Sequence, residues 1–382
     1  MRALILDPDQ RSADVRDVPK PKPSSGDVLI KVEYVALNPV DSLYVAEPLA
    51  TSRRVLGSDF AGHVVEIGSD AASNGGLKSG DRVAGFVQGA SSVNERPGAF
   101  AEHVISPWDL LWKVPDDMGL DGAATVSLCA LTAAQALFYR MGLPPPWDES
   151  KSRSTLSTLE PQYFLVYGAS TSVGLFAAQL LQQMEAKLDT RIILIGVASK
   201  KQWEMLKAPP YSYDHLLDYR DPDWLASADA LTSGKGLGYA YDCISEGETV
   251  AKIDSIMQPT GRLMVVRSIQ GGAWTVPKEF KVEPSYGAVW EGLGEEVQYK
   301  GMNLPANPRA RAFAVEFYRW LSSRRTVQPS RVRLMPGGLD KIAADGFGLL
   351  GSGTMDDRVK RDEEWMKPIS AEKLVYQLSW TG

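Results

Sequence analysis

The stretch Tyr163–Gly174 constrains the fold more than any other part of this chain. Its first residues, Phe164–Tyr167, form an apolar run without alternation, which is typical of a strand buried on both faces. The small residues Gly168–Ser172 follow, and the apolar positions after them recur with the spacing of a helix. A strand, a tight turn and a helix in this order predict the first unit of a dinucleotide-binding βαβ fold, in which the helix N-terminus binds a pyrophosphate.

The glycine pattern of that turn is incomplete. In the GxGxxG register that ends at Gly174, Ala169 and Thr171 stand where the first two glycines are expected. A sharp strand–helix turn without a ligand is therefore the alternative interpretation. If a pyrophosphate binds here, hydroxyl groups of the Ser-Thr-Ser segment 170–172 can partly replace what the missing glycines would supply.

Two kinds of pattern divide the chain. Short strands separated by Pro, Gly and Asp turns fill its first part and predict a small barrel or sandwich. These strand candidates are Ala3–Leu6, Val28–Tyr34, Gly62–Ile67, Arg82–Phe86 and Ala101–Ile105. An Ala-rich helical stretch over Gly122–Met141 leads into the second part, where strands alternate with helices and predict a parallel sheet covered on both faces.

The fold class that we expect is therefore α/β, with two domains. A β-rich domain would occupy 1–127, completed by the tail 330–382, in which Lys373–Leu378 is a strand candidate. A doubly wound parallel-sheet domain would occupy 128–329, with a helix over Arg309–Arg324 and a loop over 144–160 whose Pro, Ser, Thr and charged residues predict mobility.

Charge and cysteine content limit the partners and the compartment. The chain has 382 residues, a net charge of −6 and 44% hydrophobic residues, so it has no broad basic surface for nucleic acid or an anionic membrane. Cys129 and Cys243 are far apart and form neither a disulfide framework nor a Cys-rich metal site. No apolar run is long enough to span a bilayer, and the first residues are too short an apolar segment for a signal peptide. We expect a cytoplasmic protein.

Four sequence blocks in the first domain occur in a characteristic order. They are Val28–Val32, Ala36–Asp41, Leu56–Gly62 and Gly80–Val83. Placed before a mid-chain dinucleotide fold and a returning tail, these blocks resemble the medium-chain dehydrogenase/reductase superfamily. The resemblance implies a GroES-like β-rich catalytic domain followed by a Rossmann domain that binds the cofactor.

Within that superfamily the chain is most similar to the trans-acting enoyl reductases of fungal polyketide synthase clusters, such as the reductase of the lovastatin pathway. The segments that carry this similarity are Gly98–Glu102, Gly142–Pro144, Tyr167–Ser172, Asp218–Arg220, Tyr241–Ile244 and Ala371–Val375. The similarity implies NADPH-dependent hydride transfer to the α,β-double bond of a polyketide thioester, carried by the acyl carrier domain of a polyketide or hybrid synthase. The alternatives are a stand-alone quinone or enone reductase and a non-catalytic NADPH-binding protein.

The residues argue against a catalytic zinc ion. Zinc-containing members of the superfamily hold the metal with a Cys in the second block and a His-Glu pair in the third, where this chain has Asn38 and the pair Ser58-Asp59. The chain's three histidines have no ligand-like spacing. We expect no metal.

The cofactor residues follow from the second strand of the dinucleotide fold and from the resemblance. Ser199, Lys200 and Lys201 stand where an NAD-specific relative has a carboxylate, and a hydroxyl with two cations suits the 2′-phosphate of NADPH. A solvated helix start is the alternative interpretation of this segment. The full set of expected cofactor residues is Val40, Asp41, Ser42, Leu43, Ser170, Thr171, Ser172, Val173, Ser199, Lys200, Lys201, Gln202, Tyr219, Val266, Arg267, Ser370 and Lys373.

Two further segments are expected, by resemblance, to line the substrate pocket. Their residues are Thr132, Ala133, Ala134, Gln135, Ala136, Leu137, Phe138 and Tyr139 in the first, and Ser285, Tyr286, Gly287, Ala288 and Val289 in the second. Ordinary packing in a helix core is the alternative for single apolar members of the first segment.

No residue of the chain stands out as an essential acid. In a conjugate reduction without a metal, hydride adds to the β-carbon, and the α-carbon then needs a proton. Water or the Tyr286 hydroxyl is our hypothesis for its source. We also expect a monomer, because Pro259 and the segment Arg267–Gly272 make a poor strand-pairing edge.

Overall fold

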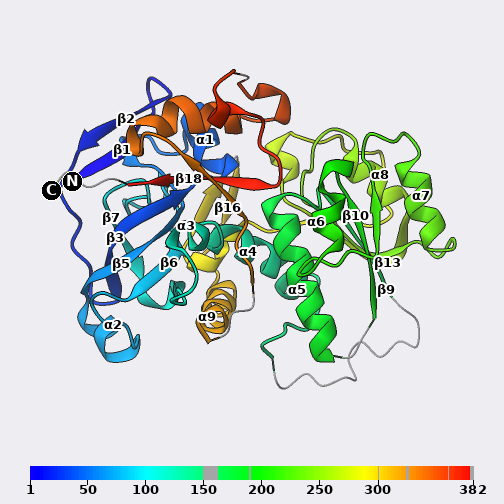
Figure 1. Ribbon diagram of the computed structural model, residues 1–382, viewed down its shortest axis with the longest axis horizontal. Helices are drawn as coiled ribbons and strands as arrows, with labels where there is room; N and C mark the ends of the chain where they lie inside the picture. The colour runs from blue at the N-terminus through cyan, green and yellow to red at the C-terminus, as the bar shows by residue number, and fades with distance from the viewer. Residues whose placement is uncertain (149–161, 189–190, 300, 324–326, 360, 379–382) are drawn as a thin grey trace. The chain divides into compact units, whose positions relative to one another are not determined.

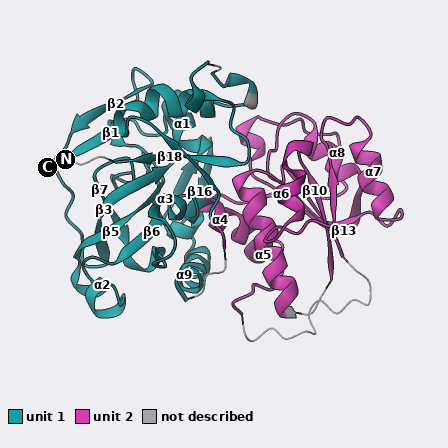
Figure 2. Ribbon diagram, viewed as in Figure 1, with its two compact units in different colours: residues 1–128, 290–325, 329–382 teal, residues 129–289, 326–328 magenta. Residues whose placement is uncertain are grey.

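The computed structural model describes residues 1–148, 162–188, 191–299, 301–323, 327–359 and 361–378 (Figure 1). The chain divides into two compact units (Figure 2). Unit 1 comprises residues 1–128, 290–325 and 329–382, and unit 2 comprises residues 129–289 and 326–328. Most of the loop 144–160, for which we expect mobility, lies outside the described residues.

The division differs from the expected domain boundaries chiefly in the segment 290–325, which lies in unit 1, and by single residues at 128 and 329. The cause is helix α9 (Pro308–Ser323), which buries Phe317, Trp320 and Leu321. Its polar residues bond to unit 1 as well, since the Tyr318 hydroxyl donates to the Ser127 carbonyl at 3.0 Å. The apolar stripe of this helix is evident in the sequence, but the stripe does not reveal which sheet the helix covers.

Unit 2 is built on a six-stranded sheet in the order β11-β10-β9-β12-β13-β14, and every neighbouring pair is parallel. The strands are β9 (Gln162–Tyr167), β10 (Ile192–Val197), β11 (His215–Leu217), β12 (Leu237–Asp242), β13 (Met257–Val265) and β14 (Ser285–Tyr286). This is the Rossmann order, and it confirms the expected doubly wound sheet. The short strand β14 has no counterpart among the sequence-based elements.

Helices cover both faces of this sheet. They are α5 (Ser172–Leu188), α6 (Trp203–Lys207), α7 (Trp224–Leu231) and α8 (Thr249–Ser255). In Figure 1, α5 and α6 lie on one side of the strands, and α7 and α8 lie on the other. Trp224 from α7 and Ile253 from α8 pack into one apolar cluster with sheet residues such as Leu165.

Unit 1 contains a larger, mainly antiparallel sheet in the order β17-β18-β3-β5-β6-β8, with β7 also pairing with β3. Its strands are β3 (Asp27–Ala36), β5 (Asp59–Ile67), β6 (Arg82–Phe86), β7 (His103–Pro107), β8 (Leu111–Lys113), β17 (Arg331–Met335) and β18 (Glu372–Gln377). The expected tail strand is therefore present, and Val375 of β18 pairs with Ala36 of β3 although the two are far apart in sequence (Figure 1).

Smaller elements complete unit 1. Two more sheets are formed by β1 (Arg2–Asp7), β2 (Ser12–Asp17) and β4 (Arg54–Val55), and by β15 (Val297–Tyr299) and β16 (Met302–Leu304). The helices include α1 (Pro39–Ala46), α2 (Ser69–Asn74), α3 (Leu120–Ala123), α10 (Leu339–Lys341) and α11 (Phe347–Leu350).

The Ala-rich stretch 122–141 is not one regular helix. It is divided into α3, α4 (Ser127–Ala134) and a π-helical segment over Gln135–Arg140. The Thr125 hydroxyl donates to the Gly122 carbonyl at 2.7 Å and accepts the Ser330 amide at 3.1 Å, which separates α3 from α4. Among the helices described, none combines the length and the apolar character that a bilayer span requires.

Candidate functional site

The strand order in unit 2 reverses between β9 and β12, and their carboxyl ends lie side by side. The Cys243 amide, just past β12, donates to the Tyr167 carbonyl at the end of β9 at 2.9 Å. In open parallel sheets, ligands bind in the crevice beyond the strands at this reversal point. The Tyr163–Gly174 stretch therefore has the place in the fold that a dinucleotide-binding turn requires.

Two glycines and a threonine shape that turn. Gly168 has a φ of +74°, and the Thr171 amide donates to its carbonyl at 2.9 Å. Thr171 Oγ1 accepts the Gly174 amide at 3.1 Å and so caps α5. A Cβ at Gly174 would lie 2.5 Å from the Gly168 oxygen. Helix and turn thus approach as closely as the third glycine of the dinucleotide fingerprint allows, and the turn fits such a cofactor.

The other expected residues of the turn lie where a ligand can reach them. Ser170, Ser172 and Val173 are half-buried at the N-terminus of α5. The free amides of a helix start favour an anionic group. Thr171 differs from its serine neighbours, because its hydroxyl oxygen already caps the helix.

A group of cations lies beyond the ends of β10 and β11. Lys200 and Lys201 are exposed, and so is Arg220, whose Nη1 donates to Ser199 Oγ at 3.0 Å. The Arg220 guanidinium lies 4.4 Å from the ring centroid of Tyr219, which is 45% exposed. We name Ser199, Lys200, Lys201, Tyr219 and Arg220 the Arg220 group, because a hydroxyl and three cations share this edge.

Sequence reasoning missed Arg220. Its only signal was its place directly after Tyr219, in a segment that already carried the family resemblance. Asp218 lies 3.5 Å from the Arg220 guanidinium and offsets part of its charge. The backbone N–H of Gln202, which is also expected at the cofactor, donates to the Ser199 carbonyl at 2.9 Å and so helps to shape the turn that contains Ser199.

A buried carboxylate organises the ends of β12 and β13. Asp242 is fully buried and accepts hydrogen bonds from the Ile244 and Ser245 amides at 2.9 and 2.8 Å and from the Thr249 hydroxyl at 2.5 Å. Burial raises the pKa of Asp242, and these hydrogen bonds oppose the rise. Ser245 Oγ then accepts the Val266 amide at 3.1 Å, which fixes the position of this expected cofactor residue.

Arg267, the neighbour of Val266, has its charge matched inside unit 2. Its Nη2 lies 2.9 Å from Glu246 Oε1. Sequence reasoning did not assign a role to Asp242, although an Asp at the end of a buried strand was visible in the Tyr241–Ile244 segment.

The two expected substrate segments meet within unit 2. Gln135 Nε2 donates to the Val289 carbonyl at 3.5 Å, and a Cβ at Gly287 would lie 2.7 Å from Arg140 Nε. The first segment includes all of the π-helical turn 135–140 except Arg140, and such a distortion is frequent at functional sites. Arg140, which sequence reasoning did not name, therefore lies beside both segments.

Exposure separates the members of these segments. Eight members are buried: Ala133, Ala134, Gln135, Ala136, Leu137, Phe138, Ala288 and Val289. For the apolar members of the first segment, burial is what the alternative of ordinary helix-core packing expects. Thr132, Tyr139, Tyr286 and Gly287 are half-buried, and Ser285 is exposed. Tyr286 lies in β14, where it pairs with Val265 of β13.

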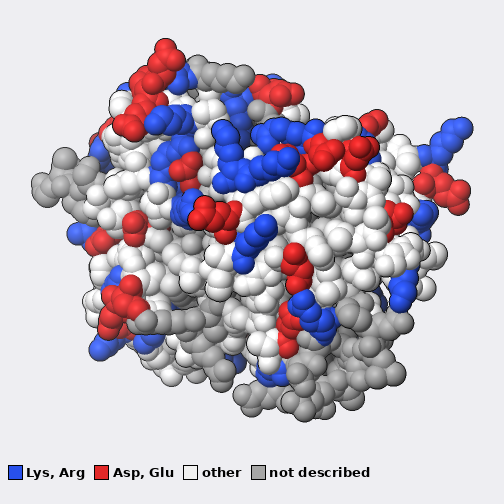
Figure 3. All heavy atoms as spheres, turned by 45° about the vertical axis from the view of Figure 1, so that its right-hand side comes forward, with Lys and Arg blue, Asp and Glu red and all other residues white. Residues whose placement is uncertain are grey.

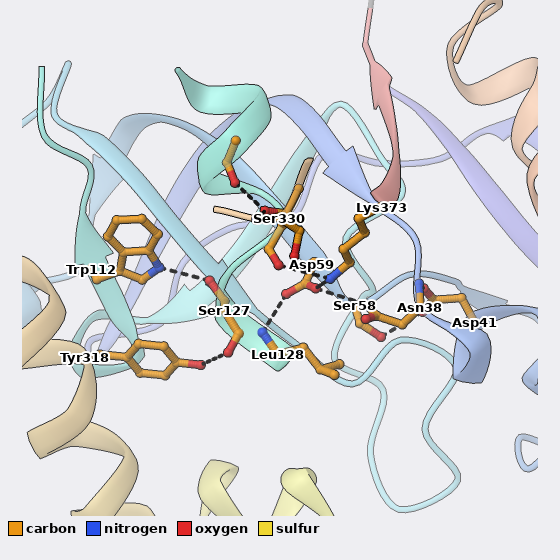
Figure 4. Close-up of polar contacts among 12 residues, drawn as sticks. Asn38, Asp41, Ser58, Asp59, Trp112, Ser127, Leu128, Tyr318, Ser330 and Lys373 are labelled. Carbon is orange, nitrogen blue, oxygen red and sulfur yellow. Dashed lines mark hydrogen bonds and ion pairs between the residues drawn. The ribbon is translucent and has the colours of Figure 1, made fainter. Parts of the chain in front are cut away.

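A second group of polar residues lies inside unit 1 (Figure 4). Asp59 is fully buried, and its carboxylate receives three donors: Asn38 Nδ2 at 3.0 Å, the Leu128 amide at 2.9 Å and Lys373 Nζ at 2.6 Å. The Ser127 hydroxyl next to Leu128 accepts the Trp112 indole N–H at 2.9 Å. We name Asn38, Asp41, Ser58, Asp59 and Lys373 the Asp59 cluster.

Asp41 is the other carboxylate of this cluster. Its Oδ1 accepts a hydrogen bond from the Ser58 hydroxyl at 2.7 Å, and its Oδ2 accepts one from the backbone amide of Asn38 at 2.8 Å. Burial raises the pKa of Asp41 to about 7, and the nearby charge of Asp59 adds to this, while its two hydrogen bonds and Lys373 oppose it. A carboxyl group is thus held close to its protonation midpoint at neutral pH.

The expected cofactor residues of unit 1 fall into two groups. Asp41, Ser42 and Lys373 are buried and bonded inside the unit; the Ser42 hydroxyl, for example, donates to the Gly351 carbonyl at 2.6 Å. Val40 and Leu43 are half-buried, with Val40 packed against the apolar core of unit 1, and Ser370 is exposed.

The Asp59 cluster does not fit a zinc ion. Asn38 and Ser58, an amide and a hydroxyl, stand where the resemblance implies the Cys and His ligands of zinc-containing relatives, and Asp59 is bound by an ammonium group. In the described parts of the chain, no group of three or more His, Cys, Asp and Glu residues is arranged to hold a metal ion.

Comparisons with known proteins agree with this division of the chain. Residues 24–116 match the family described as alcohol dehydrogenase GroES-like domain, and residues 172–284 match the family described as zinc-binding dehydrogenase. The trans-enoyl reductase ACTTS2 of Alternaria alternata is 30% identical over 99% of this chain and 98% of its own. The trans-enoyl reductase ffsC of Aspergillus flavipes is 32% identical over 92% of this chain and 88% of its own.

Solved structures share the fold at low identity. The CurK enoyl reductase aligns with a TM-score of 0.70 at 17% identity, covering 99% of both chains. A mycobacterial protein, Rv1454c, solved in complex with NADPH, aligns with a TM-score of 0.67 at 20% identity, covering 99% of this chain and 100% of its own.

Proposed function

Because this chain belongs to the trans-enoyl reductases of the medium-chain dehydrogenase/reductase superfamily, and is therefore an oxidoreductase, we propose that NADPH is its hydride donor. The substrate that we propose is the α,β-double bond of a polyketide thioester, carried by the acyl carrier domain of a polyketide synthase.

The Arg220 group is the observation that supports the choice of NADPH over NADH. Arg220 and Ser199 are joined at 3.0 Å beyond the ends of β10 and β11, and Lys200 and Lys201 follow directly. In this fold, that edge receives the adenosine ribose, where a carboxylate would select the 2′-hydroxyl of NADH. A hydroxyl and three cations instead suit a 2′-phosphate, which carries up to two negative charges.

The remaining residues have positioning roles in this proposal. The α5 N-terminus and Ser170–Ser172 hold the pyrophosphate, and Val266, fixed through Ser245 by Asp242, lies beside the nicotinamide half. When bound, the cofactor supplies a hydride to the β-carbon. The chain must then hold the alkene in place, which alone accounts for a large rate gain, and Tyr286 or water donates the proton to the α-carbon.

The partner is a protein-bound thioester. The relatives are named as reductases that act in trans, which supports a reductase that serves a separate synthase. Basic and acidic side chains are interspersed over much of the face shown in Figure 3, several Lys and Arg side chains lie together in its upper middle, and large areas between them carry neither charge. We propose that the chain acts as a monomer; a doubled mass by light scattering would contradict this.

Cofactor titration and activity test the proposal. We expect NADPH to bind at least tenfold more tightly than NADH, and Arg220→Ala to weaken NADPH binding by about tenfold while leaving NADH binding unchanged. Arg262→Ala, which removes an exposed arginine from β13 in the same unit, is the matched control. Equal affinity for both cofactors in the parent protein would contradict the choice of NADPH.

The substrate is tested separately. We expect NADPH oxidation with an α,β-unsaturated acyl-pantetheine thioester, and a further gain when the acyl group is carried by the carrier domain. Turnover of simple quinones or enones with no turnover of the thioester would instead identify a stand-alone quinone or enone reductase.

A further inference from the structure

Three contacts hold the Arg220 side chain at the edge of unit 2. Its Nη1 donates to Ser199 Oγ at 3.0 Å and lies 3.5 Å from Asp218 Oδ1. Its Cζ lies over the Tyr219 ring, 4.4 Å from the ring centroid. A long side chain that is 58% exposed is therefore restrained at one nitrogen and on one face of its guanidinium.

The turn after β11 brings these groups together. Asp218 Oδ1 accepts a hydrogen bond from the backbone amide of Arg220 at 3.0 Å, and the Asp218 side chain is only 11% exposed. An Asp that binds the amide two residues later fixes the shape of a turn. Val197 of β10 pairs with Leu217 of β11, and this register places Ser199, two residues beyond Val197, within reach of Arg220.

These contacts leave one edge of the Arg220 guanidinium open. Both polar contacts use Nη1, and Nε and Nη2 have no hydrogen-bond partner among the residues that the structure describes. Nε and Nη2 together form a planar fork that can bind two oxygens of one phosphate. Lys200 and Lys201 follow Ser199, and both are exposed. The fork is therefore preorganised for a phosphate, with further positive charge beside it.

The contact with Arg220 bears on the role of Tyr219, which the resemblance predicts at the cofactor. The Tyr219 ring is 45% exposed, and one of its faces carries the guanidinium. A cation over an aromatic face is attracted by the ring electrons, and the contact is made in the protein alone. This face of the ring is thus occupied and is not available for stacking on an adenine base.

We propose that Tyr219 is a positioning residue, whose ring holds the Arg220 guanidinium so that the Nε–Nη2 fork meets the 2′-phosphate of NADPH, and that the ring does not stack on the adenine. This inference rests on the proposed function, because it takes the ligand of the Arg220 group to be that phosphate. All the residues that it uses lie in unit 2. Tyr219 then favours NADPH over NADH without contacting the phosphate itself.

Titration of the full chain with NADPH and with NADH tests this role. We expect Tyr219→Leu, which removes the aromatic face, to weaken NADPH binding by about three- to fivefold and to leave NADH binding within about 1.5-fold. Tyr219→Phe keeps the face and should bind NADPH like the parent protein. Tyr219→Leu combined with Arg220→Ala should bind NADPH within about 1.5-fold of Arg220→Ala alone, because no guanidinium is left to position. Arg262→Ala is again the matched control.

A ring that stacked on the adenine would give a different pattern. Tyr219→Leu would then weaken NADPH and NADH equally, and it would weaken NADPH further when combined with Arg220→Ala; either result would overturn the inference. A loss of NADPH affinity in Tyr219→Phe would assign the contact to the hydroxyl and would overturn it as well. Competition with 2′,5′-ADP and with 5′-AMP repeats the comparison without the nicotinamide, and only 2′,5′-ADP should bind more weakly to Tyr219→Leu.

The parent protein separates this inference from the proposed function. If the parent protein binds NADPH no more tightly than NADH, the choice of NADPH fails. If it prefers NADPH and Tyr219→Leu weakens both cofactors together, only the positioning role of Tyr219 fails.

Discussion

Asp41→Asn isolates the effect of one buried charge on the stability of unit 1. The side-chain oxygen of the new asparagine can accept a hydrogen bond from the backbone amide of Asn38, as Asp41 Oδ2 does at 2.8 Å in the parent protein. Its side-chain N–H can donate to Ser58 Oγ, which in the parent protein donates to Asp41 Oδ1 at 2.7 Å. Shape and hydrogen bonding are thus retained, and the change removes only the ionisation of a fully buried group.

The magnitude follows from the pKa of Asp41, which rises from 3.8 to about 7. Each unit corresponds to roughly 1.4 kcal/mol, so the full effect is about 4 kcal/mol. The native state holds the proton more tightly than the unfolded chain, so this contribution is complete below about pH 4, and it is lost as the pH rises to about 7. Between pH 5 and pH 8 the loss amounts to roughly 2 to 3 kcal/mol.

Urea unfolding at pH 5, 6, 7 and 8, followed by tryptophan fluorescence, measures this loss. Asp41→Asn cannot ionise at this position and so does not lose this stability. From pH 5 to pH 8, the free energy of unfolding of the variant should therefore rise by roughly 2 to 3 kcal/mol relative to that of the parent protein. Asp116→Asn, at an exposed carboxylate of the same unit, is the control. A difference between Asp41→Asn and the parent protein that stays constant from pH 5 to pH 8 would refute the reasoning.

Three further predictions concern unit 2. Gly174→Ala places a Cβ 2.5 Å from the Gly168 oxygen, so NADPH affinity in a fluorescence titration should fall by about tenfold or more, whereas Gly26→Ala, which meets open space, should have no effect. Tyr286→Phe should lower kcat by on the order of 100-fold if its hydroxyl donates the proton, and unchanged turnover would remove it as the donor. Asp242→Ala leaves buried donors without an acceptor and should cost on the order of 3 kcal/mol by thermal unfolding, while a cost near zero would mean that the turn does not depend on this carboxylate.

The sequence predicts those parts of the fold and site that are contiguous in the chain. The strand, the turn and the start of the helix over Tyr163–Gly174 are adjacent in the sequence and adjacent in the structure, so their local pattern was sufficient. β14 was missed because a two-residue strand, Ser285–Tyr286, has no periodicity to detect. Gly122–Met141 was read as one helical stretch because the Thr125 contact that interrupts it involves Ser330, about two hundred residues away.

The Asp59 cluster shows the same limit at the level of side chains. Asn38, Asp59 and Lys373 were each visible, but their convergence depends on how β3, β5 and β18 align, which no local pattern reports. Lys373 and Asp41 were predicted to bind the cofactor, which stays a prediction, and the structure shows both side chains buried among hydrogen-bond partners in unit 1. Arg220 was overlooked because a single exposed arginine after a turn resembles any solvated surface cation.

The position of β18 has a consequence for the biosynthesis of this protein. β18 pairs with β3 on one side and β17 on the other, yet the ribosome makes it only after all of unit 2 has been synthesised. Until then the edge of β3 that pairs with β18 has no partner strand, and the Asp59 carboxylate lacks the Lys373 ammonium. Unit 2 comes almost entirely from one continuous segment and can fold as it leaves the ribosome, whereas the sheet of unit 1 closes last. A ribosome stalled before Lys373 would therefore hold a nascent chain in which unit 2 is folded and the unit 1 sheet lacks β18. The unpaired edge of that sheet would then be accessible to chaperones and proteases.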